Sequence, residues 1–287
     1  MPIVVGSPRS GTTLLRFMLD SHPELAIPPE TGFLRLGPKL RGTGEHAREK
    51  FFRAVVNYPK DAPVWPDFEI PEEEFRDALA RIEPFTVAEG FRAFYKLYAA
   101  RFGKPRWGDK TPHYCFELET IRRVLPEARF VHIIRDGRDA ALSLRGMWFS
   151  PGWRIETQAL YWLKCVRAAR RAGLGRPDYA EVRFEDLVLD PRASLRRVCA
   201  HVELTFDERM LSYYTRAPER LLEHKERTRP EGTPLLTREQ RLRQQALTTK
   251  PPDPGRVFAW KRTMDADEVR RFGRVAGGLL TELGYEA

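Results

Sequence analysis

The residues that could do chemistry begin near the N-terminus, in the run Gly6-Ser7-Pro8-Arg9-Ser10-Gly11-Thr12-Thr13. Its spacing, G-x-x-x-x-G-x-[ST], is that of a phosphate-binding loop. The apolar run Ile3 to Val5 precedes the loop and predicts a buried strand, and a helical pattern follows from Thr13 to Ser21. Backbone N–H groups at such a junction converge on an anion, so the sequence predicts an anion site here.

Two features separate this loop from that of a nucleotide triphosphatase. Thr12 stands where those enzymes have Lys, and the nearby cation is Arg9 instead. The clearest buried strand, residues 129–134, ends at Arg135 and not at an Asp that could bind Mg²⁺. We therefore expect an anion that needs no metal, and no Cys, His or carboxylate cluster has the spacing of a metal site.

Composition sets the class of protein. The chain has 287 residues, of which 42% are apolar, enough for a buried core in one or two domains. Its cysteines, Cys115, Cys165 and Cys199, are too few for a disulfide scaffold. No apolar run reaches the roughly 18 residues that cross a bilayer, and no signal peptide precedes the first strand, so we expect a cytoplasmic protein. The net charge of +9 fits a phosphate- or sulfate-bearing partner or an Arg-rich composition alone.

Strands and helices alternate along the chain. Strands are predicted at residues 3–5, 25–27, 106–107, 129–134 and 179–184. The longer helices are predicted at 13–21, 154–172, 191–202 and 265–283. This alternation predicts an α/β fold with a mostly parallel central sheet and helices on both faces.

Two stretches interrupt this alternation. Residues 31–103 are predicted to form a mostly helical insertion. Residues 216–256 are irregular and rich in Arg, Glu, Thr and Pro, and we interpret them as a long lid loop because a helix follows them. We expect residues 1–287 to form a single domain.

The loop and several later motifs resemble one enzyme family. Pro8 to Leu15 resembles the 5′-phosphosulfate loop of sulfotransferases that use 3′-phosphoadenylyl sulfate (PAPS), and Met18 to Glu24 with Glu30-Thr31 is similar to tyrosylprotein sulfotransferases in particular. The likeness continues at Asp109-Lys110-Thr111-Pro112, Arg135-Asp136-Gly137-Arg138 with Ser143, Arg183 to Val188, Lys250-Pro251, Trp260 and Leu283-Gly284-Tyr285. Residues 40–105 and 205–245 match little. The resemblance implies a P-loop NTPase-like three-layer fold and sulfuryl transfer from PAPS, without a metal, releasing adenosine 3′,5′-bisphosphate (PAP).

The resemblance also implies how PAPS would be held. Arg9 would contact the sulfonate or the 5′-phosphate. Arg135 ends a strand, where ligands bind in open α/β sheets, and would grip the 3′-phosphate with Ser143, about two helical turns later. The loop residues that would hold the 5′-phosphate are Ser10, Gly11, Thr12, Thr13 and Leu14.

Other positions complete or vary the implied cofactor site. Lys250 would contact the cofactor from the C-terminal loop, with Arg256 as a nearby alternative. Phe184 departs from the Tyr that tyrosylprotein sulfotransferases show there, which removes a hydroxyl. Three aromatics could wall an acceptor pocket or pack in the core: Trp148, Phe149 and Trp153.

Arg9, Glu30 and Lys110 form the implied catalytic set. Lys110 would stabilise the bridging oxygen of the leaving group. Glu30 follows a strand that we place in the same sheet, and it would take the acceptor's proton as the general base. His113 is the alternative base, because cytosolic sulfotransferases use a His shortly after the matching Lys, although its spacing from Lys110 differs from theirs.

Other function classes make different predictions. A metal-dependent P-loop kinase, or similar phosphotransferase, predicts Lys at position 12 and a strand-end Asp, and both are missing. A nucleic-acid-binding protein predicts a clustered basic face, whereas acidic residues are interspersed with Arg, as in Arg216 to Arg243. A PAP-binding protein without catalysis is disfavoured because the catalytic set is intact. We expect a small-molecule or peptide acceptor (a phenol or tyrosine, a sugar, a lipid or a natural product), no nucleic acid and no membrane span, with a homodimer left open.

Overall fold

A parallel sheet forms the centre of the molecule in the computed structural model, which describes residues 1–40 and 42–286. Its four strands run in the order β4-β1-β5-β6. They are β1 (Pro2–Gly6), β4 (Asp109–Lys110), β5 (Arg129–Ile134) and β6 (Tyr179–Arg183). All three pairings are parallel, and β1 is buried along its whole length. Burial on both sides is what covered parallel strands require.

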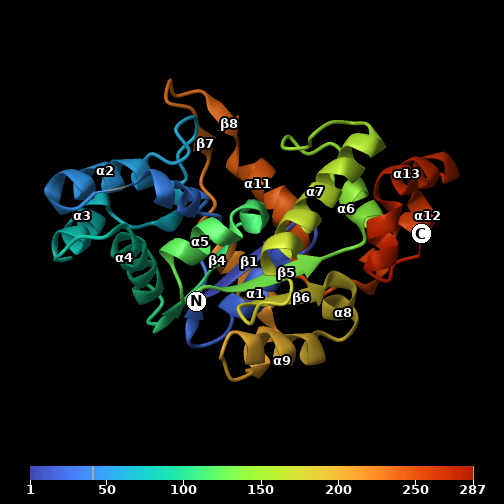
Figure 1. Cartoon of the computed structure of the whole chain (residues 1–287), viewed down its shortest axis with the longest axis horizontal. Coiled ribbons are helices and arrows are strands. Elements are labelled where there is room, and N and C mark those ends of the chain that lie inside the picture. The colour runs from blue at the N-terminus through green and yellow to red at the C-terminus, as the bar shows by residue number, and fades with distance from the viewer. Residues whose placement is uncertain (41, 287) are drawn as a thin grey trace.

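Helices cover both faces of this sheet, which gives three layers (Figure 1). Side chains alternate along β1, so Ile3 and Val5 join one apolar cluster and Val4 joins another. The flanking helices are α1 (Thr12–Asp20), α5 (Leu118–Val124), α6 (Gly137–Leu144), α7 (Ile155–Gly173), α8 (Phe184–Leu189), α9 (Pro191–His201), α12 (Trp260–Thr263) and α13 (Ala266–Glu282). The predicted three-layer α/β fold with a mostly parallel sheet is confirmed.

Residues 31–103 are mostly helical. They contain α2 (Gly44–Val56), α3 (Glu72–Ala80) and α4 (Val87–Ala100), with short 3₁₀ segments between them. These helices gather at the left of Figure 1. Aromatic rings hold them together, with Phe94 packed edge-on against Phe33 at 4.9 Å and against Phe68 at 4.8 Å. Such pairs contribute stability beyond their buried area.

The second predicted strand is real but belongs to a different sheet. β2 (Leu25–Ala26) pairs in parallel with β3 (Arg106–Trp107) alone. The expectation that Glu30 follows a strand of the central sheet is therefore wrong. However, only Gly108 separates β3 from β4, and its N–H donates to the carbonyl of Ala26 at 2.9 Å. The chain before Glu30 thus still runs along the strand that carries Lys110.

Residues 216–256 contain short elements, although we predicted a continuous loop. They are α10 (Ala217–Leu221), the antiparallel pair β7 (Arg227–Thr228) and β8 (Pro234–Leu236), and α11 (Arg238–Gln245). Buried ion pairs fasten the start of this segment to α1: Arg220 donates to Asp20 at 2.8 Å, and Arg16 lies 3.3 Å from Glu223. The segment is therefore held against the helix that follows the phosphate-binding loop.

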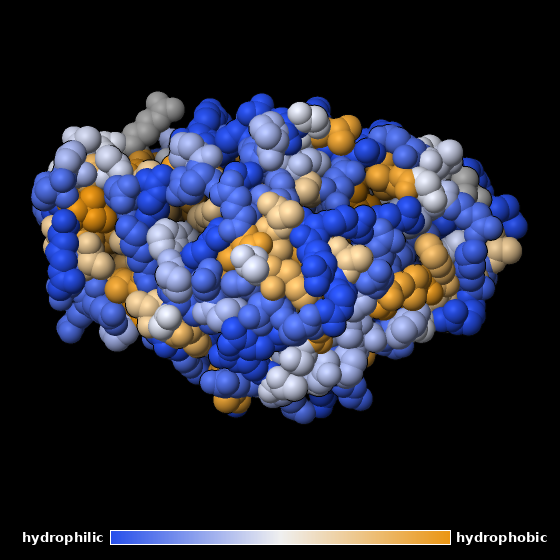
Figure 2. Space-filling view, turned by 90° about the horizontal axis from the view of Figure 1, so that it is seen from below, coloured by the Kyte–Doolittle hydropathy of each residue, from blue (hydrophilic) through white to orange (hydrophobic). Residues whose placement is uncertain are grey.

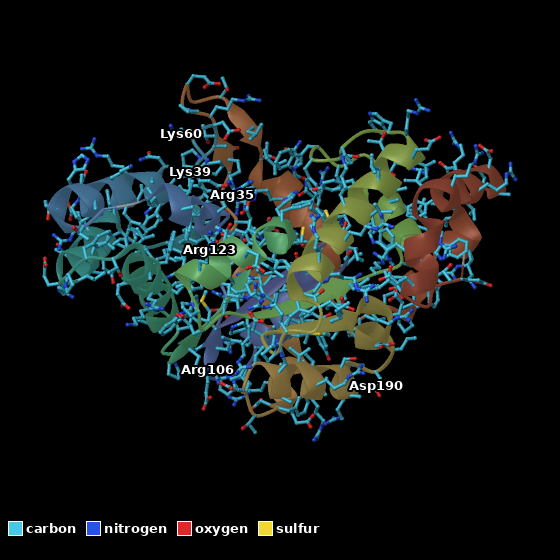
Figure 3. The ribbon with its side chains drawn as sticks, in the orientation of Figure 1. Arg35, Lys39, Lys60, Arg106, Arg123 and Asp190 are labelled. Atoms are coloured by element: carbon cyan, nitrogen blue, oxygen red, sulfur yellow. The ribbon has the colours of Figure 1, made fainter. Side chains whose placement is uncertain are left out.

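The outer surface is mainly polar. Seen from below, hydrophilic residues dominate and apolar side chains form separate small patches (Figure 2). Charged side chains surround the ribbon, with Arg35 and Lys60 toward the β7–β8 hairpin and Arg106 and Asp190 at the lower edge (Figure 3). Within residues 1–40 and 42–286, no helix has both the length and the apolar character needed to cross a membrane.

Substituting Gly11→Ala tests how tightly the loop packs. Gly11 has a φ of 97°, and an added Cβ would lie 2.5 Å from the buried ring of Phe184. The left-handed backbone costs a non-glycine residue about 1–2 kcal/mol, and the overlap adds about 1–3 kcal/mol. Gly146→Ala is the matched control, because Gly146 has a φ of 78° but open space around it. Urea unfolding should show the larger loss of stability for Gly11→Ala. Equal losses would contradict the contact with Phe184.

Candidate active site

The predicted phosphate-binding loop joins β1 to α1 in a conformation suited to an anion. Arg9 and Gly11 both have positive φ, 68° and 97°. The N–H of Ser10 donates to the carbonyl of Ser7 at 3.2 Å. Gly11 is the N-cap of α1 and has no side chain to cap the first turn. The N–H groups that open α1 are therefore available to a ligand.

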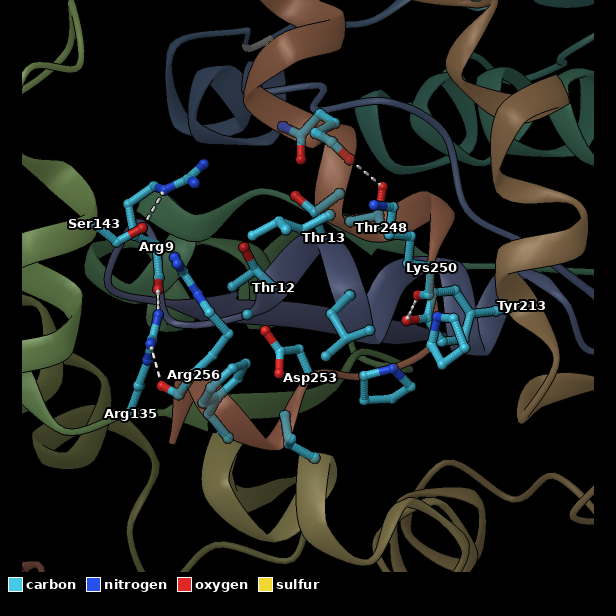
Figure 4. Close-up of a pocket in the computed structure, with 18 of the residues that line it drawn as sticks. Arg9, Thr12, Thr13, Arg135, Ser143, Tyr213, Thr248, Lys250, Asp253 and Arg256 are labelled. Atoms are coloured by element: carbon cyan, nitrogen blue, oxygen red, sulfur yellow. Dashed lines mark hydrogen bonds between the residues drawn. The ribbon is translucent and has the colours of Figure 1, made fainter. Parts of the chain in front are cut away.

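A cavity of about 330 Å³ lies against this loop (Figure 4). It brings together side chains from the loop, the end of β5, helix α6 and the C-terminal segment. Among the predicted cofactor residues, those that line it are Arg9, Gly11, Thr12, Thr13, Leu14, Arg135, Ser143 and Lys250. The alternative, Arg256, lines it too. Ser10 does not line the cavity; its buried hydroxyl has no hydrogen-bond partner within residues 1–40 and 42–286.

Three guanidinium groups meet at one end of this cavity. Arg9 Nε donates to Ser143 Oγ at 3.0 Å, while Arg135 donates to the carbonyls of Arg9 and Arg256 at 3.2 and 2.8 Å (Figure 4). Burial, and then the charges of Arg135 and Arg256, lower the pKa of Arg9. The carboxylate of Asp139 lies 3.7 Å from Arg135. The cluster therefore keeps an excess of positive charge, which suits a multiply charged anion.

A second cavity of about 340 Å³ adjoins the first and shares Arg9, Thr12 and Thr13 with it. Lys110 lies at this shared wall, with Nζ 2.5 Å from Glu30 Oε1 and 3.3 Å from Thr13 Oγ1. Lys110 is buried, whereas the side chain of Glu30 is 47% exposed. All three predicted catalytic residues therefore line the second cavity; Arg9 also lines the first, and Lys110 lies beside the shared residue Thr13.

The charge of Lys110 controls the ionisation of Glu30. Withdrawal from water favours the neutral acid, but the charge and hydrogen bond of Lys110 outweigh this and lower the pKa of Glu30 below its usual 4.5. Glu30 is therefore a carboxylate at neutral pH. Burial lowers the pKa of Lys110 in turn, against the opposing effect of Glu30.

His113 also lines the second cavity. It follows β4 in a 3₁₀ segment, Pro112–Phe116, and its Nε2 lies 2.5 Å from the hydroxyl of Tyr161. Burial lowers the pKa of His113 below its usual 6.5, although the charge of Glu30 acts in the opposite direction. Both candidate bases therefore stand beside one cavity.

The predicted aromatic residues divide between the two cavities and the surface. Trp148 and Phe149 line the second cavity, and Trp148 is 60% exposed. Trp153 is 77% exposed and lines neither cavity, so neither Trp is a core residue. Phe184 lines the first cavity, where Arg135 lies 4.4 Å above its ring. The position therefore keeps a packing role without a hydroxyl.

Several residues of the second cavity were missed by sequence reasoning. Arg227 and Arg241 line it, and both are paired with the buried carboxylate of Asp67. Arg241 donates to it at 2.8 and 2.6 Å, and Arg227 lies 3.6 Å away. These residues carry no motif. Only the fold brings Asp67, in the helical insertion, to the hairpin and α11.

A model of the sulfotransferase family matches residues 3–208, the greater part of the chain. The chain belongs to the sulfotransferase family. The resemblance predicted from its motifs, including that to tyrosylprotein sulfotransferases, is confirmed by two relatives. Nodulation protein NoeE of Sinorhizobium fredii (strain NBRC 101917 / NGR234) is 28% identical over 99% of this chain and 65% of its own length. Protein-tyrosine sulfotransferase A of Caenorhabditis elegans is 25% identical over 98% of this chain and 66% of its own length. The chain thus spans about two thirds of these relatives.

Solved sulfotransferases share the fold. The sulfotransferase domain from the Synechococcus PCC 7002 olefin synthase has a TM-score of 0.64 and 22% identity, covering 100% of this chain and 95% of that domain. Mouse sulfotransferase SULT7A1, complexed with PAP, has a TM-score of 0.52 and 14% identity, covering 96% and 81%. Within residues 1–40 and 42–286, no three His, Cys, Asp or Glu residues are grouped to hold a metal ion.

Lys110→Met tests the ion pair. The substitution keeps the length of the side chain but removes the positive charge that lowers the pKa of Glu30, so that pKa should rise. The measurement is an NMR titration of the Glu30 carboxyl carbon. Lys250→Met is the control, because Lys250 lines only the first cavity, and it should leave the titration unchanged. An unchanged titration in Lys110→Met would contradict the pairing.

Proposed function

We propose that the protein transfers a sulfuryl group from PAPS to an acceptor hydroxyl and releases PAP. The observation that carries this proposal is the meeting of two cavities at Arg9 and Thr13, with Lys110 of the second cavity 3.3 Å from Thr13. One cavity has the phosphate-binding loop and excess positive charge, and the other has Glu30 and His113. Family membership supports sulfuryl transfer, and the PAP in the mouse neighbour supports this choice of donor.

PAPS would occupy the first cavity. The opening N–H groups of α1 and the hydroxyls of Thr12 and Thr13 would hold the 5′-phosphate. Arg135 and Ser143 would hold the 3′-phosphate, beside the third guanidinium of the cluster, Arg256. Since the cluster lacks a full set of counter-charges, a dianionic phosphate suits it better than a neutral ribose hydroxyl.

Catalysis would then be mostly positioning and charge stabilisation, as in phosphoryl transfer. The acceptor oxygen bonds to sulfur as the bond between sulfur and the bridging oxygen of PAPS breaks. Glu30 takes the proton that the acceptor hydroxyl loses. Lys110 stabilises the charge that develops on the departing oxygen, and Arg9 does so from the shared wall.

The acidity of Glu30 fits this role. Because the positive charge of Lys110 lowers its pKa, Glu30 is a carboxylate at neutral pH. Its Oε1 already lies beside Lys110, so the proposed base and the cation that stabilises the departing oxygen stand together before the acceptor enters. A phenol would need less help from the base than an alcohol, since its own pKa is about 10.

Arg135→Ala tests the nature of the donor. A charge-assisted hydrogen bond contributes roughly 1.5–3 kcal/mol, so PAP should bind about one to two decades more weakly. ADP lacks the 3′-phosphate and should bind nearly as before. Calorimetry with both nucleotides gives the measurement. Arg145→Ala is the control, because Arg145 pairs with Glu268 at 2.7 Å and lines neither cavity, so PAP affinity should not change. Equal losses for PAP and ADP in Arg135→Ala would remove the assignment.

Glu30→Gln tests the base. Gln keeps the size of the side chain and loses its basicity, so sulfuryl transfer should fall about 10²–10⁴-fold. PAP should still bind, because Glu30 does not line the first cavity. The measurement is single-turnover transfer of labelled sulfuryl from bound PAPS to water and to a phenol.

Glu117→Gln is the matched control for that experiment. Glu117 lines a neighbouring cavity and lies 3.3 Å from Arg35, so its substitution should leave turnover within about twofold. His113→Ala should cost less than Glu30→Gln. Near-normal turnover in Glu30→Gln together with an inactive His113→Ala would reverse the two roles.

A further inference from the structure

A contact with Tyr161 holds one ring nitrogen of His113 against the protein core. Its hydroxyl lies 2.5 Å from His113 Nε2, and the two rings are 6.2 Å apart. Tyr161 comes from the middle of α7 and packs against the apolar cluster on one face of the sheet. One nitrogen of His113 is therefore committed to the scaffold, and Nδ1 is the ring nitrogen left to meet a group in the acceptor cavity.

The tautomer of His113 decides which partner donates in this contact. Burial lowers the pKa of His113 and raises that of Tyr161, so both groups are neutral near pH 7. The hydroxyl of Tyr161 has one proton to donate, and His113 Nε2 can accept it. If the phenol donates, the single proton of the neutral imidazole must reside on Nδ1.

A hydrogen-bond donor at Nδ1 of His113 would support the Glu30 carboxylate in the proposed reaction. Lys110 holds Glu30 at 2.5 Å, yet the proposed reaction also needs Lys110 at the departing oxygen. As Lys110 turns to that oxygen, Glu30 loses its partner just when it must take a proton. His113 lines the acceptor cavity together with Glu30, and the two residues also line a neighbouring cavity together.

We infer that Tyr161 is a positioning residue that fixes His113 as the Nδ1–H tautomer, so that this N–H supports the Glu30 carboxylate during transfer. The inference rests on the proposed function only for the role of Glu30. Neither Tyr161 nor His113 gains or loses a proton in the reaction. The proton of the acceptor passes to Glu30 alone. The side chains of Tyr161 and His113 only hold the Glu30 carboxylate in place.

The tautomer is tested without any acceptor. Imidazole nitrogen shifts from NMR of the PAP-loaded protein should show a protonated Nδ1 for His113. Tyr161→Phe should shift the proton toward Nε2. An internal control is present, because His132 Nδ1 lies 2.6 Å from the hydroxyl of Tyr179, away from both cavities, and its signals should not move. A protonated Nε2 on His113 in the parent protein would overturn the inference.

Kinetics test the use of the tautomer. Hydrolysis of labelled PAPS, with water as the acceptor, should slow about three- to tenfold in Tyr161→Phe, which is the value of one hydrogen bond, with PAP affinity unchanged. His113→Asn places an amide N–H near the position of Nδ1 and should retain most of the rate. The double variant with Tyr161→Phe and His113→Asn should then hydrolyse PAPS at the same rate as His113→Asn alone.

Controls and contrary results separate this inference from the proposed function. Tyr179→Phe removes the hydroxyl of the other His–Tyr pair and should leave the hydrolysis rate unchanged. An inactive His113→Asn, or an unchanged rate in Tyr161→Phe, would overturn the support role. Near-normal turnover in Glu30→Gln would instead remove the proposed base and leave the tautomer result standing.

Discussion

Buried positive charge at the carboxyl ends of the central strands is the constraint on which this site depends. Arg135 is buried there, with Arg9 and Arg256 half-buried beside it, and a guanidinium withdrawn from water is costly without a partner. The fold compensates only in part, with backbone carbonyls, with the ring of Phe184 4.4 Å from Arg135, and with Asp139 at 3.7 Å. The proposed anionic donor would complete the compensation, and its binding would then stabilise the folded state.

The second cavity also contains a buried cation, but there the protein itself supplies the counter-charge. Lys110 is the buried cation there, and Glu30 supplies its counter-charge from a partly exposed position. Because Glu30 is both the partner of Lys110 and the candidate base, the proposed transfer requires this pair to separate. The hydroxyl of Thr13, 3.3 Å from Lys110, lies on the loop side and offers the ammonium an alternative partner.

Local signals predicted many of the residues that the fold brings to the two cavities, and long-range pairing explains what they missed. Arg9 lies in the glycine loop, Lys110 ends β4 and Arg135 follows β5, so their places could be read from short motifs. Glu30 also lines the second cavity. It follows the two-residue strand β2, and no local pattern in the sequence reveals that β2 pairs with β3. Tyr161 reads as one more residue of an amphipathic helix. Asp67 and Arg241 are separated by 174 positions and meet only through packing of the helical insertion.

One carboxylate links the parts of the site that local sequence left separate. Asp20, at the end of α1, accepts the N–H of Ile27 at 2.8 Å and the guanidinium of Arg220 at 2.8 Å. It therefore holds the loop helix, the chain just before Glu30 and the start of residues 216–256 in one buried cluster. Removing one partner of such a cluster typically costs about 3–5 kcal/mol. The segment that lines the cavities is thus anchored at its N-terminal end by Asp20, and its hairpin and α11 are anchored by the pairing of Arg227 and Arg241 with Asp67.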